Sequence, residues 1–137
     1  MAVNVEEMQV GVAEVVDYSK ITGVFAKVLR EVVQRGITAG EAKKRGIVVS
    51  DEELQKSADV FRASNKLKTA GETETWLKER GLTLDALESY LETNLYIYKL
   101  KEELVKEADK EKYYAAPVVK DTLRQMAYEE WLKEQVK

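Results

Sequence analysis

The stretch that decides the fold is residues 83–112, TLDALESYLETNLYIYKLKEELVKEADKEK. Its apolar side chains recur at steps of three and four residues, which is the spacing of one helix face. These positions are Leu84, Leu87, Leu91, Leu95 and Tyr98, followed by Ile97, Leu100, Leu104 and Ala108. Thr83 is a suitable N-cap residue. The pattern therefore predicts one long helix over about residues 84–112, against which the rest of the chain can pack.

Shorter helices are expected on both sides of this long helix. Residues 50–53, SDEE, have the spacing of a capping box and place acidic side chains at the positive end of a helix dipole. The tetrad TAGE occurs twice, at residues 38–41 and 69–72, and each copy also has the capping-box spacing. Pro117 suits the first turn of a last helix. The expected helices cover residues 38–46, 51–65, 70–80 and about 118–136.

The N-terminal part is rich in valine, and two helices are expected there. The first covers about residues 5–18, but its β-branched side chains and Gly11 weaken helix formation, so a strand-like stretch is the alternative. The second follows Ser19 as N-cap and ends at Gly36, with a continuous apolar stripe. Residues 1–18 contain four acidic and no basic side chains. We interpret this segment as a helix that can pack on a partner.

The composition leaves few residue types that could perform catalysis. The 137 residues include no Cys and no His, which excludes disulfides, thiolate nucleophiles, Ser-His pairs and the usual zinc sites. Adjacent carboxylates, such as Glu102 and Glu103, point about 100° apart on a helix and do not converge on a substrate. Only 1 Pro and 7 Gly occur, with 34% charged and 45% hydrophobic residues. We expect a single all-α domain over residues 1–137 that is not an enzyme and holds no cofactor or metal.

Charge and hydropathy also limit the partners. The chain has 22 basic and 25 acidic residues, a net charge of -3, so it lacks the basic excess of a nucleic-acid-binding protein. It has no run of about 18 apolar residues, so no membrane span is expected. The first residues, MAVNVEEMQV, lack the basic start and apolar core of an export signal. As written, the chain is expected in the cytoplasm, or outside it if a signal has been removed.

Most aromatic side chains lie in the last third of the chain. A tyrosine combines an apolar ring with a polar tip, which suits a partly hydrated groove that contacts peptides without strict specificity. The alternative is a helix–helix interface whose tyrosine hydroxyls reach water, and both interpretations stay open. The residues concerned are Tyr90, Tyr96, Tyr98, Tyr113, Tyr114, Tyr128 and Trp131.

Three stretches in a fixed order carry a resemblance to a known family. GIVVSDEEL at residues 46–54 and GLTLDALESYL at residues 81–91 resemble the N-terminal chaperone module of SurA-type and related parvulin-associated foldases. LRQMAYEEWL at residues 123–132 looks like the helix that returns to this module after the parvulin domain. The matches cover about 110 of the 137 residues. Between Lys112 and Pro117 there is no room for a parvulin domain, so prolyl isomerase activity is not carried over.

The resemblance implies an all-α, SurA-N-like domain of about five to seven helices, with a long central helix and a returning C-terminal helix over residues 117–137. It implies a non-catalytic chaperone or peptide escort that holds unfolded or leader-like peptides in an apolar, Tyr-lined groove. The alternative function is a structural or assembly protein that forms homo-oligomers through its N-terminal apolar helix. The expected groove residues are Tyr113, Tyr114 and Pro117, with Phe61, Tyr128 and Trp131 expected more in the core than in contact with peptide.

Overall fold

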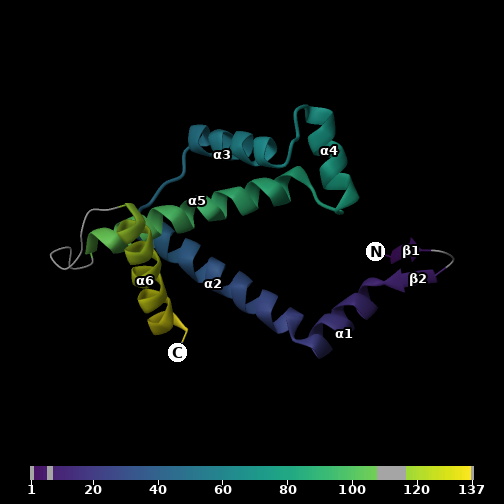
Figure 1. The fold of residues 1–137 in the computed structure, drawn as a ribbon, viewed down its shortest axis with the longest axis horizontal. Coiled ribbons are helices and arrows are strands. Elements are labelled where there is room, and N and C mark those ends of the chain that lie inside the picture. Colours follow the sequence, from purple (N-terminus) through teal and green to yellow (C-terminus); the bar gives the residue numbers. More distant parts are fainter. Residues whose placement is uncertain (1, 6–7, 108–116, 137) are drawn as a thin grey trace. The chain divides into compact units, whose positions relative to one another are not determined.

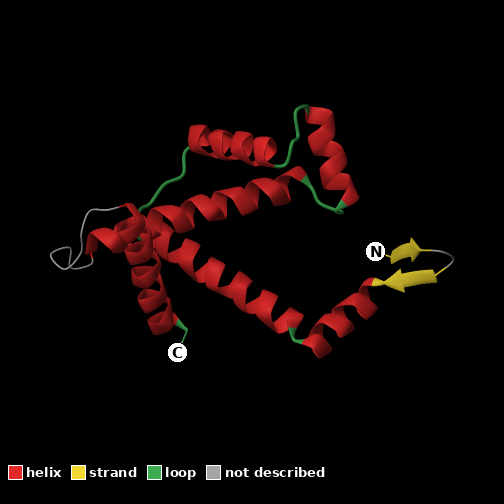
Figure 2. Cartoon of the chain, in the orientation of Figure 1, coloured by secondary structure: helices red, strands yellow, loops and turns green. Residues whose placement is uncertain are grey.

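Helices make up most of the chain in the computed structural model, which describes residues 2–5, 8–107 and 117–136. Six helices lie within this described part, which confirms the all-α fold and the expected number of helices (Figure 2). Their bounds are α1 Val12–Thr22, α2 Val24–Lys44, α3 Asp51–Ser64, α4 Ala70–Glu79, α5 Leu84–Glu107 and α6 Pro117–Gln135. The chain forms two compact units, residues 1–35 and residues 36–137. Figure 1 labels the elements of both units.

The first unit begins with a β-hairpin where a helix over residues 5–18 was expected. Strand β1, Ala2–Val5, pairs antiparallel with β2, Met8–Gly11, and Val3 lies opposite Val10. β-Branched valines fit a strand better than a helix, so the strand-like alternative is correct for these residues. Gly11 keeps an extended backbone, with φ -85° and ψ 155°, and is the N-cap of α1.

The break between the first two helices lies at Gly23 and not at Ser19. Ser19 is inside α1, and its hydroxyl donates a hydrogen bond to the carbonyl of Val16 at 2.7 Å instead of capping a new helix. Gly23 has a φ of 85°, in the left-handed region where glycine is favoured. The predicted helix start after Ser19 is therefore wrong by about one turn.

The second difference from the prediction is that α2 does not stop at Gly36. It continues through the first TAGE tetrad to Lys44, so no separate short helix starts at Thr38. The side chains of Thr38, Ala39 and Ala42 are buried, and the Thr38 hydroxyl lies 3.1 Å from the hydroxyl of Tyr128. Tertiary packing decides helix length more than local propensity does, and here it stabilises the helix across two glycines.

The core of the second unit consists of two clusters, and both include side chains of α5. In the described part of this unit, α5 packs against α3 and against α6 (Figure 1). The first cluster contains Ala42, Leu100 and Leu104, with Ile47, Tyr96, Ala127, Tyr128 and Trp131 packed on it. The second contains Leu77, Leu87 and Leu91, with Leu54, Ala58, Phe61 and Trp76 packed on it. The long central helix expected from the sequence thus organises this unit.

Local capping and one ion pair fix the start of α3 on α5. The capping box is present, because Ser50 Oγ accepts the Glu53 backbone N–H while the Glu53 carboxylate accepts the Ser50 backbone N–H. Lys99 Nζ lies 2.6 Å from Glu53 Oε2 and donates to the Val48 carbonyl at 2.7 Å. The hydrogen bond from Lys99, followed by that from the Ser50 backbone, lowers the pKa of Glu53 below its usual range. The cap and the ion pair therefore share one carboxylate.

None of the described helices is both long and apolar enough to cross a membrane.

Truncating the fully buried Leu100 tests the role of α5. Leu100→Ala removes side-chain atoms from the first cluster and leaves a cavity, so it should lower the free energy of unfolding by about 2–5 kcal/mol. Val48, which is 70% exposed, provides the control, and Val48→Ala should change stability by less than about 0.5 kcal/mol. Urea denaturation followed by circular dichroism measures both. Equal effects of the two substitutions would contradict the described core.

The shared carboxylate predicts a pH dependence of stability. The pKa of Glu53 is lower in the folded chain than its ordinary value of 4.5, so its stabilising contribution is present above that value. The contribution is lost as the pH falls through the folded pKa. Glu53→Gln should therefore lower the urea midpoint at about pH 7, and the difference from the wild type should shrink by about pH 3.

Glu52→Gln is the matched control for this substitution. It makes the same charge change in the same helical turn, where Glu52 faces only Lys56 at 3.5 Å, with both side chains at least 75% exposed. It should have a smaller effect at neutral pH, because exposed pairs contribute little. A Glu53→Gln effect that does not depend on pH would show that the ion pair with Lys99 is not its cause.

Candidate functional site

Large apolar side chains lie exposed along α1 and the first half of α2. Their exposed fractions range from 37% for Phe25 to 86% for Ile21. We refer to these ten residues as the N-terminal apolar surface: Val12, Val15, Tyr18, Ile21, Val24, Phe25, Val28, Leu29, Val32 and Val33. All ten belong to the first unit.

The helical period of α2 explains how the sequence produces this surface. At about 100° per residue, the positions 24, 25, 28, 29, 32 and 33 fall on one side of the helix. Lys27, Arg30 and Glu31 fall on the other side. In α1, Val12 and Val15 are one turn apart. An amphipathic pattern normally places the apolar side of a helix in a core. Here the apolar sides of α1 and of the first half of α2 are exposed.

The first unit has no core of its own among its described side chains. From residue 9 to residue 35, every described side chain is exposed or half-buried, whereas residues 36–137 bury nine apolar side chains and two threonines among those described. Monomeric proteins rarely expose a contiguous apolar patch of more than a few hundred Å², and larger patches mark interaction sites. The N-terminal apolar surface is therefore the candidate functional site.

Phe61, one of the expected groove residues, packs inside the second cluster. Its ring meets that of Trp76 edge-on, with 5.3 Å between centroids and an angle of 84°. Arg80 also lies over the ring of Trp76, with its guanidinium carbon 4.0 Å from the ring centroid. Phe61 is half-buried and helps to join α3 to α4 and α5.

Tyr128 and Trp131 pack on the first cluster. Their rings stack at a centroid distance of 6.3 Å, and Lys101 Nζ lies 4.5 Å from the centroid of Tyr128. Burial lowers the pKa of Lys101, and the positive charge of Arg124 lowers it further. Because Phe61 belongs to the other cluster, these three aromatic residues are not brought together.

The other three expected groove residues have no described side chains. Tyr113 and Tyr114 lie outside the described residues, and Pro117 is described only as the first residue of α6. Their role in peptide binding stays a prediction. The N-terminal apolar surface, in contrast, was visible in the sequence as an apolar stripe. Periodicity alone could not show whether that stripe is covered.

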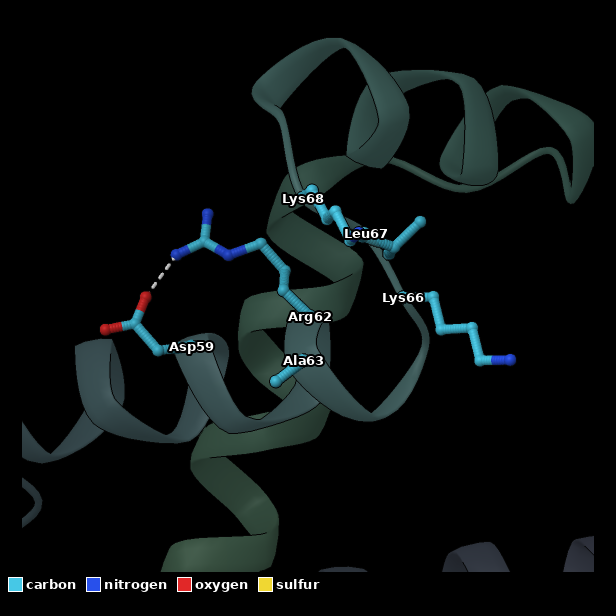
Figure 3. A pocket seen from close by; sticks show the side chains of 6 residues that line it. All are labelled: Asp59, Arg62, Ala63, Lys66, Leu67 and Lys68. Atoms are coloured by element: carbon cyan, nitrogen blue, oxygen red, sulfur yellow. Dashed lines mark hydrogen bonds and ion pairs between the residues drawn. The ribbon is translucent and has the colours of Figure 1, made fainter.

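An open hollow of about 500 Å³ lies beside the C-terminal end of α3 (Figure 3). Asp59 and Arg62 form an ion pair at its edge. The hydrogen bond from the Leu67 N–H to the Arg62 carbonyl, at 2.8 Å, closes the turn that follows the helix. The lining residues are Asp59, Arg62, Ala63, Lys66, Leu67 and Lys68. This hollow is the outer side of a helix-ending turn, and surface lysines alone do not make a binding site.

The carboxylates of Glu53 and Asp59 both have a lowered pKa. Hydrogen bonds from Lys99 and Arg62 lower the pKa of Glu53 and of Asp59, respectively. A general acid at neutral pH needs a raised carboxyl pKa, so these two groups act as structural ion-pair partners. Within residues 2–5, 8–107 and 117–136, no group of three or more acidic side chains could hold a metal ion.

Comparisons of the chain with protein families, with curated proteins and with solved structures give no match.

Proposed function

We propose that the chain is a non-catalytic peptide-binding chaperone or peptide escort, which holds unfolded or leader-like peptides. The observation that supports this proposal is the N-terminal apolar surface, ten large side chains without a cover in the described structure. An unfolded or leader-like peptide exposes apolar side chains that are normally buried or protected. Both surfaces lose contact with water when they meet, and that transfer is favourable without any specific sequence.

The chemistry of the surface sets the strength and selectivity of this binding. Valine, leucine and phenylalanine offer no directional hydrogen bonds, and beyond the first turn the backbone amides of α1 and α2 donate within the helices. Each buried CH₂ group contributes about 0.8 kcal/mol, from which the cost of ordering the peptide is subtracted. The expected result is modest affinity for many apolar segments, which suits a protein that must also release its client.

The aromatic groove expected from the sequence enters the proposal as a second contact region. Tyr113, Tyr114 and Pro117 are its proposed peptide contacts. Phe61, Tyr128 and Trp131 are proposed mainly as supports, in keeping with their half-buried packing on the two clusters.

The second candidate is a structural or assembly protein that forms homo-oligomers. The valine content of the N-terminal apolar surface favours it, because valine has one strongly preferred rotamer in a helix and presents a fixed shape. Surfaces that accept many clients are often flexible and rich in methionine. A surface of fixed shape suits a folded partner whose own surface also has a fixed shape, such as a second copy of the chain.

The proposed chaperone function predicts that polar substitutions on the surface weaken client binding. Val28→Gln with Leu29→Gln removes two side chains that are 50% and 52% exposed and keeps helix propensity. The Kd for a fluorescent, unstructured apolar peptide should rise by about tenfold. Suppression of light scattering from an aggregating client should weaken in parallel.

A matched control tests whether any loss of apolar surface has this effect. Val60→Gln with Leu84→Gln removes two side chains that are 65% and 54% exposed in the second unit. This variant should bind peptide and suppress aggregation as the wild type does. A wild-type chain that neither binds the peptide nor reduces scattering would overturn the proposed function.

A further inference from the structure

The N-terminal apolar surface has two halves of nearly equal length. Helix α1 has 11 residues, Val12–Thr22, and the part of α2 within the first unit runs over residues 24–35. Gly23 separates them with its left-handed backbone. A surface with its break at the centre can be matched end to end by a second copy turned through 180°, which is the geometry of a two-fold interface.

The charges of the two halves are opposite in sign. Residues 12–22 carry two acidic and one basic side chain, a net charge of -1, whereas residues 24–35 carry three basic side chains and one acidic side chain, a net charge of +2. Two copies aligned in the same direction would place acidic beside acidic and basic beside basic. Two copies aligned in opposite directions place each half of net negative charge beside a half of net positive charge, although Glu14 then faces Glu31. This complementarity of net charge selects orientation more than it adds affinity.

The apolar area is large enough for a stable pair. A standard interface covers about 800 Å² on each partner. Ten large side chains between 37% and 86% exposed supply an apolar area of that order. Covering them would also stabilise α1, a valine-rich helix of 11 residues with no buried side chain of its own, since short helices depend on packing.

We propose that a second copy of this chain covers the N-terminal apolar surface, in an antiparallel pair whose two-fold axis passes near Gly23. Each copy offers the same face to the other, so the assembly closes as a dimer and leaves no surface for a third copy. Residues at equal distances from the axis then face each other. Val12 lies opposite Val33 of the second copy, Val16 opposite Leu29, and Ile21 opposite Val24. The proposal stands on the geometry and charge of the first unit and does not rest on client binding.

Engineered cysteines read out the orientation directly, because the natural chain contains no cysteine. Val12→Cys and Val33→Cys are prepared separately, mixed under reducing conditions to exchange subunits, and then oxidised. The antiparallel pair predicts a disulfide between the two variants in the mixture and little linkage in either variant alone. Efficient linkage of Val12→Cys to itself would place the copies in the same direction and overturn the proposed arrangement.

Sedimentation of the complete chain, without any client, tests the assembly itself. From about 1 to about 200 µM, the wild type should shift from one chain mass towards twice that mass. Val28→Gln with Leu29→Gln should stay monomeric over this range, and Val60→Gln with Leu84→Gln should dimerise as the wild type does. A monomeric wild type, a larger oligomer or equal behaviour of the two variants would overturn the proposal. Because no client is present, failure here and failure of the chaperone proposal are separate results.

Discussion

The apolar face of α5 must be buried, and the arrangement of residues 36–137 depends on this constraint. Leu87 and Leu91 near the start of α5 enter one cluster, and Leu100 and Leu104 near its end enter the other. Ala42 of α2 belongs to the first cluster, on which α6 also packs, while α3 and α4 pack at the second cluster. One helix thus connects two small cores that share no buried residue.

The first unit is built from the same kinds of residues, but its large apolar side chains are exposed in the part of the chain that the structure describes. Its helices are amphipathic, as those of the second unit are, and α2 takes part in both units. Before Gly36 its large apolar side chains are exposed, and after Gly36 its small side chains Thr38, Ala39 and Ala42 are buried. Small residues allow close helix packing within one chain, while large valines project further and offer more area to an outside partner. The change in side-chain size along one helix therefore coincides with the change from exposed to buried side chains.

How well the sequence predicts this structure depends on whether the deciding contacts are local. Capping boxes involve residues three positions apart, and α3 and α4 begin where Ser50 and Thr69 indicate. The same TAGE pattern at Thr38 failed because its hydroxyl meets Tyr128, a residue 90 positions away. The candidate site was predictable as an apolar stripe, since periodicity is local. Its exposure was not predictable, since exposure depends on everything that could cover it.

One surface, the N-terminal apolar surface, would serve both proposed roles. A client peptide and a second copy would bury the same side chains, so they cannot bind at once. The client peptide and the second copy would therefore compete. Binding of either one would lower the apparent affinity of the chain for the other, because it reduces the population of chains whose surface is free. In the dimer the surface would be buried and unable to bind clients. Dilution of the protein or accumulation of clients would favour dissociation into monomers that can bind them. Such competition would keep an apolar surface of this size away from water between clients and would lower the tendency of the free chain to aggregate.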